Sequence, residues 1–415
     1  MTGIRVSRLA LAIGLTASTT TTVMAAPQTF QTARSFAMGG TGVAVAHPAT
    51  ANIANPAMLA DDHHDWADDF GLILPSVNAR FADEEEVVDQ IDDIQDTIDR
   101  LANSDTPVEA QENAGVLRRQ LDELDRDTAR VDVGAGLSLS IPLETLSVGV
   151  FTDGSLRVTT RGNVTDNDLE ILREIEEDVI AASEVATGVR DVESELTSDG
   201  TVIAASTAEI GVSFARGFEL ANGHSLSLGL SPKYVQLRTF EYVQRVGDFD
   251  DDDFDSDENE TDDSQFNVDL GAAYRFGEDG EWNAGLSVRN LLPMDLESTS
   301  GAELEIDPRI TAGIAHNGEY HVTTAELDLT EQKGFGFSDD TQWLAVGAEF
   351  DALRYAQLRV GLRHNLASND DHRGVEEETQ FTAGIGLSPF GARLDIGGLI
   401  SDSEVGAAIE LGAAF

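Results

Sequence analysis

The stretch that decides the fold is EVGAAIELGAAF, residues Glu404 to Phe415. Apolar residues occupy every second position from Val405 onward, and the residues between them are acidic or small. Successive side chains of a β-strand point to opposite faces, so a period of two indicates a strand. We therefore predict a strand here, with one apolar face and one polar or small face.

The same alternation recurs upstream. It is clear in residues 131–141, 266–276, 282–289 and 357–363. A soluble β-sandwich also alternates in this way. Here, however, the polar face is rich in glycine and serine with isolated charges, and not in lysine and glutamate, which favours a membrane barrel over a soluble sandwich.

Connections of two lengths join the predicted strands. Short turns such as 278–280 and 317–318 alternate with long loops such as 291–305 and 331–340. This is typical of transmembrane β-barrels, whose short turns lie in the periplasm. We count fourteen antiparallel strands, an even number that returns the chain end to the periplasm, and so predict an all-β transmembrane barrel over residues 66–415. The strands are expected at 66–82, 131–141, 145–160, 205–218, 223–247, 265–277, 281–290, 307–316, 319–330, 341–350, 356–366, 378–388, 391–400 and 404–415.

Two insertions, residues 83–128 and 166–197, break the strand pattern. Apolar residues recur there at steps of three and four, which predicts amphipathic helices, with a break at 103–106. The loop order places both insertions outside the cell. Their apolar stripes are expected to pack against each other, the alternative being a coiled-coil-like surface for a partner.

The N-terminus has the features of a cleaved signal peptide over residues 1–25. Arg5 and Arg8 precede a short apolar stretch, and Val23 and Ala25 stand at the −3 and −1 positions of the cleavage site. No later apolar run approaches the ~20 residues of a membrane-spanning helix. We therefore expect export to the outer membrane of a Gram-negative cell, where the chain spans as strands.

Composition excludes two classes of function. The chain of 415 residues has a formal net charge of −50 and only two lysines, so we exclude nucleic acid as a partner. It has no cysteine, which excludes thioredoxin-type redox chemistry. Such acidity suggests a salt-rich, halophilic environment, because salt screens the self-repulsion.

Residues 33–60, ARSFAMGGTGVAVAHPATANIANPAMLA, are rich in glycine and alanine and do not alternate. This segment resembles the start of the long-chain fatty-acid transporter (FadL-like) superfamily. More closely, together with the acidic helical insertion, it resembles the barrel family named for the conjugal transfer protein TraF. The resemblance implies that residues 26–65 form a hatch inside the barrel, which controls a passage for a small hydrophobic molecule. The residues matching the hatch elements are Gly39, Gly40, Gly42, Asn52, Asn55 and Pro56.

The terminal Phe415 resembles the end signal of bacterial outer-membrane barrels. It implies recognition by the barrel assembly machinery, and the barrel's expected surroundings are outer-membrane lipid and lipopolysaccharide.

No motif supports catalysis or a cofactor. His63 and His64 are neighbours on an expected strand and point apart, which disfavours a metal site. The run 248–264 holds eleven acidic residues but has Ser256 where a calcium loop requires glycine. Charges that parity places in the lumen are expected to form structural ladders. We therefore predict that the chain is not an enzyme and has no metal site, although weak binding of divalent cations by the acidic run stays open. The lumen charges include Asp132, Glu209, Asp269, Arg275, Arg289, Arg359, Arg363, Arg393, Asp395 and Glu410.

Two functions remain open. The first is uptake of small hydrophobic compounds through a barrel plugged by its hatch. The second is a non-transporting assembly or interaction protein of the outer membrane, with a role in conjugal transfer or secretion. An apolar pocket near residues 39–46 and a lateral gap would favour uptake. A lumen filled by arginine–carboxylate ladders would favour interaction.

Overall fold

The structure is a computed structural model. It describes residues 30–61, 71–83, 87–141, 143, 145–221, 223–245, 259–353, 355–369, 375, 377–389 and 392–414. The predicted signal peptide, the pair His63 and His64, most of the acidic run 248–264, and Phe415 lie outside the described residues. No helix within the described ranges is long and apolar enough to cross a membrane.

The described strands close into the predicted barrel. Each pairs antiparallel with its neighbours, and β1 pairs with β16 to complete the circle. The fourteen barrel strands are β1 (Gly71–Asp83), β2 (Thr128–Ile141), β3 (Ser147–Asn163), β4 (Asp199–Glu219), β5 (Ser225–Arg245), β6 (Glu260–Phe276), β7 (Trp282–Arg289), β10 (Arg309–Asn317), β11 (His321–Asp328), β12 (Trp343–Leu353), β13 (Ala356–Asn365), β14 (Thr379–Leu387), β15 (Ala392–Ile400) and β16 (Glu404–Ala414). The predicted fold class, an all-β barrel of fourteen antiparallel strands, is confirmed.

Side-chain parity gives the barrel an apolar outside and a polar inside. In β16, Val405, Ile409 and Leu411 are about half exposed, whereas Glu404 and Glu410 are buried. Large apolar residues are exposed on the other strands as well, for example Phe214 and Phe381. Exposure of so many large apolar side chains to water would be unfavourable, so the outer face of the barrel is suited to contact with lipid.

Aromatic rings gather at the end of the barrel that carries the short turns. Phe276 and Trp282 stack with their ring centroids 6.3 Å apart across the β6–β7 turn, and Trp282 meets His316 edge-on at 4.8 Å. Transmembrane barrels carry such girdles of aromatic residues at the membrane–water interface.

Strand β1 contains an irregularity that keeps its inward face in register. The pairing of β1 with both neighbours shifts between Ile73 and Ser76, so Leu74 and Pro75 are both exposed. Proline lacks an N–H for the ladder and is tolerated in strands at bulges. Because of this bulge, Ile73 and Ser76 both face inward and are buried.

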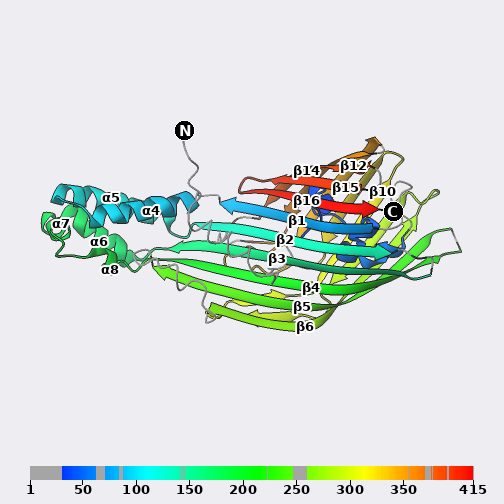
Figure 1. Cartoon of the computed structure of the whole chain (residues 1–415), viewed down its shortest axis with the longest axis horizontal. Coiled ribbons are helices and arrows are strands. Elements are labelled where there is room, and N and C mark those ends of the chain that lie inside the picture. The colour runs from blue at the N-terminus through cyan, green and yellow to red at the C-terminus, as the bar shows by residue number, and fades with distance from the viewer. Residues whose placement is uncertain are drawn as a thin grey trace.

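The two insertions fold together into one helical unit beyond the opposite end of the barrel (Figure 1). The first contains α4 (Val87–Ala102) and α5 (Pro107–Leu124), and the second α6 (Asp166–Glu177), α7 (Val179–Ala186) and α8 (Val192–Glu195). Their apolar stripes pack against each other, with Leu117, Leu121 and Leu172 fully buried in one cluster. These stripes are therefore not an open coiled-coil surface.

Some strand bounds differ from the prediction. β4 begins at Asp199, not at 205, and β6 begins at Glu260, not at 265. In the added part of β4, Val202 and Ile203 are both buried, so the alternation that reveals a half-buried strand is absent. The predicted loop 291–305 contains a hairpin, β8 (Met294–Glu297) and β9 (Glu303–Ile306), which packs against residues from β4 and β5.

Candidate functional site

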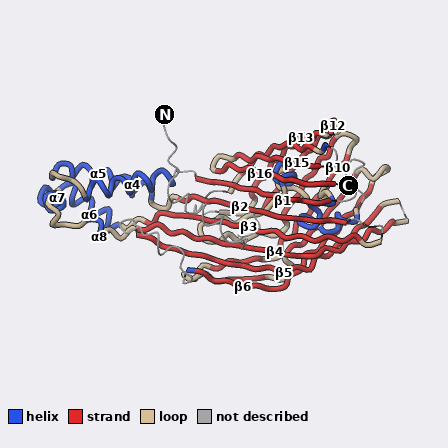
Figure 2. Tube along the Cα trace, viewed as in Figure 1, coloured by secondary structure: helices blue, strands red, loops and turns tan. Residues whose placement is uncertain are grey.

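Residues 30–61, which we call the hatch, lie inside the barrel toward the end where the chain finishes (Figures 1 and 2). Three short helices shape them: α2 (Ala33–Ala37), α3 (Pro48–Ala54) and the 3₁₀ helix η2 (Pro56–Ala60). Each begins at a residue whose side chain accepts a hydrogen bond from a free backbone N–H: Thr32, His47 and Asn55. Proline opens both α3 and η2, where its missing N–H has no cost.

The hatch glycines suit the close fit between hatch and wall. Gly39 and Gly40 have φ values of +74° and +86°, which side-chain-bearing residues adopt at a cost. A Cβ on Gly39 would lie 2.9 Å from the backbone oxygen of Leu362. Gly42 has an ordinary φ but no room, since its Cβ would lie 3.0 Å from that of Ala54.

Asn52 and Asn55 fix two hatch elements in place. The Asn52 amide donates to the hydroxyls of Ser138 and Ser140 at 2.8 Å each. The Asn55 amide donates to the carbonyl of Val43 at 2.8 Å and to that of Ala272 on β6 at 3.2 Å. Both asparagines are fully buried, as is Pro56, which opens η2.

Glycines of the barrel wall form the other side of this contact. A Cβ on Gly229, Gly285 or Gly361 would lie within 2.4 Å of hatch backbone atoms: 2.3 Å from Ala57 N, 2.3 Å from Val43 O and 2.2 Å from Gly39 N. Several of these glycines pair across neighbouring strands, as Gly229 does with Gly271 and Gly347 with Gly361. The wall therefore receives the hatch backbone directly, with no side chain between them.

Buried carboxylates of the wall hold the hatch loop and α2. The Glu326 carboxylate accepts from the backbone N–H groups of Gly42, at 2.9 Å, and Ala44, at 3.2 Å. The Arg34 guanidinium binds Glu349 through two bonds of 2.9 Å. Sequence reasoning missed Arg34, Glu326 and Glu349 as hatch contacts. Their inward parity was readable, but their hatch partners are distant in sequence.

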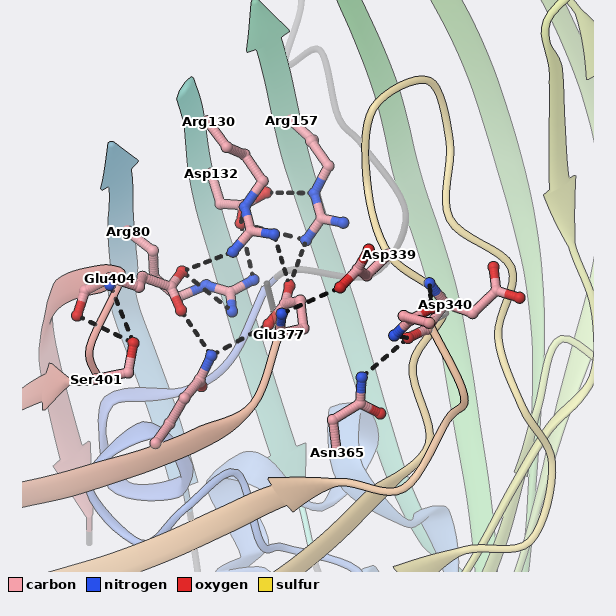
Figure 3. Close-up of polar contacts among 12 residues, drawn as sticks. Arg80, Arg130, Asp132, Arg157, Asp339, Asp340, Asn365, Glu377, Ser401 and Glu404 are labelled. Carbon is pink, nitrogen blue, oxygen red and sulfur yellow. Dashed lines mark hydrogen bonds and ion pairs between the residues drawn. The ribbon is translucent and has the colours of Figure 1, made fainter. Parts of the chain in front are cut away.

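Above the hatch, a cluster of buried charges crosses the lumen; we call it the arginine cluster. Arg80, Arg130 and Arg157 converge on Asp132, Glu377 and Glu404 (Figure 3). Arg157 Nε lies 2.6 Å from Asp132 Oδ1, Arg130 Nη1 lies 2.8 Å from Glu377 Oε1, and Arg80 Nη2 lies 3.0 Å from Asp132 Oδ2. Removing one member of a buried ion pair typically lowers the free energy of unfolding by about 3–5 kcal/mol, so the charges of this cluster depend on one another for the stability of the barrel.

Two further ion groups lie in the lumen. Lys233 Nζ contacts Glu209 at 2.8 Å and Asp269 at 2.9 Å. Arg359 joins Glu349 and Asp395, both at 2.5 Å. Of the ten lumen charges predicted from parity, seven are buried, and Arg275, Arg289 and Arg393 are partly buried. Eight of them take part in the ion pairs of the predicted ladders; Arg363 and Glu410 have none among the described residues.

Residues 41–46 are buried, and every neighbouring pair of described barrel strands is hydrogen-bonded. One apolar cluster of the lumen lies between β4, β5 and the hairpin β8–β9, where Met294, Ile306 and Phe335 pack together. Within the described residues, no group of three His, Asp or Glu side chains is placed to hold a metal ion.

These features define the chain as a transmembrane β-barrel of the outer-membrane type, closed by fourteen strands and plugged by its own N-terminal segment. Comparison with families of known sequence gives the particular assignment. The chain belongs to the TraF_2 family, described as "F plasmid transfer operon, TraF, protein", whose model matches residues 52–328, about two thirds of the sequence. No curated protein matches the chain.

Solved structures share the fold. A deltaS2S3 mutant of the monoaromatic hydrocarbon channel TodX is 14% identical, with a TM-score of 0.52, covering 93% of this chain and 99% of that chain. The deltaS2 mutant of TodX is 13% identical, with a TM-score of 0.50, covering 92% and 97%. The toluene transporter TodX of P. putida is 13% identical, with a TM-score of 0.49, covering 93% and 98%. At these identities the likeness concerns the fold alone.

Proposed function

We propose that this protein takes up small hydrophobic compounds across the outer membrane, with the hatch as its gate. The observation that carries the proposal is the hatch: a separate segment fills one end of the lumen and forms hydrogen bonds to the wall from β1 and β2 through β11 to β16. A barrel that served only as an anchor could fill its lumen with wall side chains. The TodX channels of similar fold are described as channels for monoaromatic hydrocarbons, which supports this class of ligand.

The structure is then the closed state. Since residues 41–46 are buried and the strands form a closed barrel, a ligand passes only when the hatch leaves the wall. The contact between hatch and wall allows the hatch to move away from the wall. Wall glycines place no side chain into the hatch, and polar contacts such as Asn52 to Ser138 can be replaced by water.

Toluene uptake tests this proposal. Cells that make the protein should accumulate labelled toluene faster than cells without it, and deletion of residues 28–46 should also admit small polar solutes. A variant lacking helices α4 and α5, residues 87–124, is the matched control, because it removes a segment outside the lumen. Equal solute entry for the wild type and the hatch deletion, with no toluene uptake, would refute gating.

A second function is favoured by the filled lumen. A lumen filled by arginine–carboxylate ladders is expected of a non-transporting protein, and the arginine cluster and the other ion groups form such ladders. The helical unit also has a hydrophobic core of its own. The barrel would then anchor this unit for assembly with another cell-surface component, in conjugal transfer or secretion. Deletion of 87–124 should abolish such assembly, and cells that make the wild type should take up toluene no faster than cells without it. Assembly that survives the deletion would exclude this second function.

We also propose cleavage after Ala25 and residence in the outer membrane, with the helical unit outside the cell. The apolar outer face and the aromatic rings beside the short turns support this location. Membrane fractionation should recover the mature chain in the outer membrane, heat-modifiable on gels. Recovery in the soluble periplasm would overturn it.

A further inference from the structure

A polar cavity of about 70 Å³ lies inside the lumen beside the arginine cluster. Five basic side chains line it, Arg80, Arg157, Arg309, Lys333 and Arg363, together with three acidic ones, Glu305, Asp339 and Glu377. The chain carries 26 basic residues against 76 acidic ones, so a gathering of five around one small cavity is unusual for it. The volume suits a few water molecules or one small ion.

Four of these cations have carboxylate partners. Arg309 pairs with Asp328 at 2.8 Å and Lys333 with Asp340 at 2.6 Å. Arg80 and Arg157 bind Asp132 within the arginine cluster (Figure 3). Their charges are largely neutralised before any ligand enters.

Arg363 differs from the other four. Arg363 is only 5% exposed, and no carboxylate among the described residues lies within ion-pair distance of its guanidinium. Its Nε donates to the Gln380 side-chain oxygen, and its guanidinium lies 4.2 Å from the centre of the Trp343 ring. Its Nη2 is buried and has no hydrogen-bond partner.

The surroundings fix these neutral partners. The Gln380 amide nitrogen donates to Glu404 at 2.6 Å and to Glu377 at 3.1 Å, so its oxygen must face Arg363. An amide oxygen and an aromatic ring stabilise a buried cation only in part. Burial of a guanidinium without an anion beside it is strongly unfavourable. Arg363 therefore lacks the anionic partner that would stabilise its charge.

We propose that this cavity binds a small oxyanion, a carboxylate or phosphate-type group, held by the free side of the Arg363 guanidinium. A planar guanidinium offers two parallel donors that match two oxygens of such a group. Trp343 covers one face of the guanidinium, and the paired Arg80 and Arg157 add donors at the cavity wall. This site does not depend on the proposed transport function, because the oxyanion would bind within the closed barrel.

Binding is tested on the purified full-length protein in detergent. Sodium acetate and sodium phosphate serve as the two probes, with sodium chloride at equal ionic strength and neutral acetamide as controls. Isothermal titration and the fluorescence of Trp343, assigned with the W343F variant, are the readouts. We expect saturable binding of at least one oxyanion beyond the response to chloride, and the stronger probe tells carboxylate from phosphate.

Arg363→Gln should weaken this binding at least tenfold. The matched control is Arg393→Gln, a lumen arginine that pairs with Asp395 and does not line the cavity. If Arg363→Gln does not assemble, Arg363→Lys takes its place, since it keeps the charge but loses the paired donors. A wild type that responds to oxyanions no more than to chloride, or an affinity unchanged by the Arg363 substitution, would overturn the proposal.

Discussion

Gly39→Ala should loosen the hatch while leaving the barrel intact. Gly39 has a φ of +74°, where alanine costs about 1 kcal/mol. The added Cβ would lie 2.9 Å from Leu362 O and 3.1 Å from Val346 O. These atoms belong to the hydrogen-bonded strands β13 and β12, so the hatch has to move, and overpacking typically costs about 1–3 kcal/mol.

The sum of about 2–4 kcal/mol lowers the ratio of seated to unseated hatch roughly 30- to 700-fold. Swelling of liposomes in a small sugar should report this as faster solute entry. Gly188→Ala is the matched control: its φ is +69°, but nothing lies within 4 Å of the added Cβ. Gly40→Val, at φ +86° and 3.2 Å from Gln31 Nε2, should act like Gly39→Ala. Equal swelling with the Gly39 and Gly188 variants would refute the reasoning.

Removal of Phe415 should reduce membrane insertion far more than removal of the acidic residues 250–263; equal membrane yields would contradict this. Cysteine placed at Asp96 should react with an impermeant thiol reagent on intact cells and cysteine at Asn317 should not, since the native chain has no cysteine; the opposite labelling would invert the topology. Burial opposes ionisation of Asp168, but hydrogen bonds from Ser198 and Thr197 hold its pKa below the usual range. Its contribution to stability is therefore present above about pH 4 and is lost as the pH falls through the lowered pKa. Thermal melting of the helical unit should lose this pH dependence in Asp168→Asn, and an unchanged profile would argue against the assignment.

The strands and their inward faces could be predicted from the sequence because a half-buried strand alternates. The same parity placed Asp132, Glu209 and Arg359 in the lumen, where they are buried. Where both faces are covered, as at Val202 and Ile203, the alternation is lost and the extension of β4 was missed. The hairpin β8–β9 was missed for a related reason, since its strands have only four residues each.

The candidate site was predictable only on the hatch side. Gly39 and Gly40 stand in a glycine-rich stretch, and their positive φ values are a local property. The contacts that seat the hatch join positions hundreds of residues apart, such as Gly42 with Glu326. One sequence alone carries no signal for such pairs. The recurrence of glycine at inward positions of successive strands, such as Gly347 opposite Gly361, was the one usable hint.

The central claim is that the hatch has to move for a ligand to pass, and a reversible lock tests it most directly. A Cβ built on Gly397 of β15 lies 3.3 Å from the Cβ of Ala37 in α2, close to the 3.5–4.5 Å of disulfides. The double variant Ala37→Cys with Gly397→Cys should therefore tether hatch to wall when oxidised, with the two single variants as controls. We predict that oxidation stops toluene uptake and that reduction restores it in the double variant alone. Uptake at the same rate in the oxidised and reduced double variant, with the tether verified by mass, would contradict the claim.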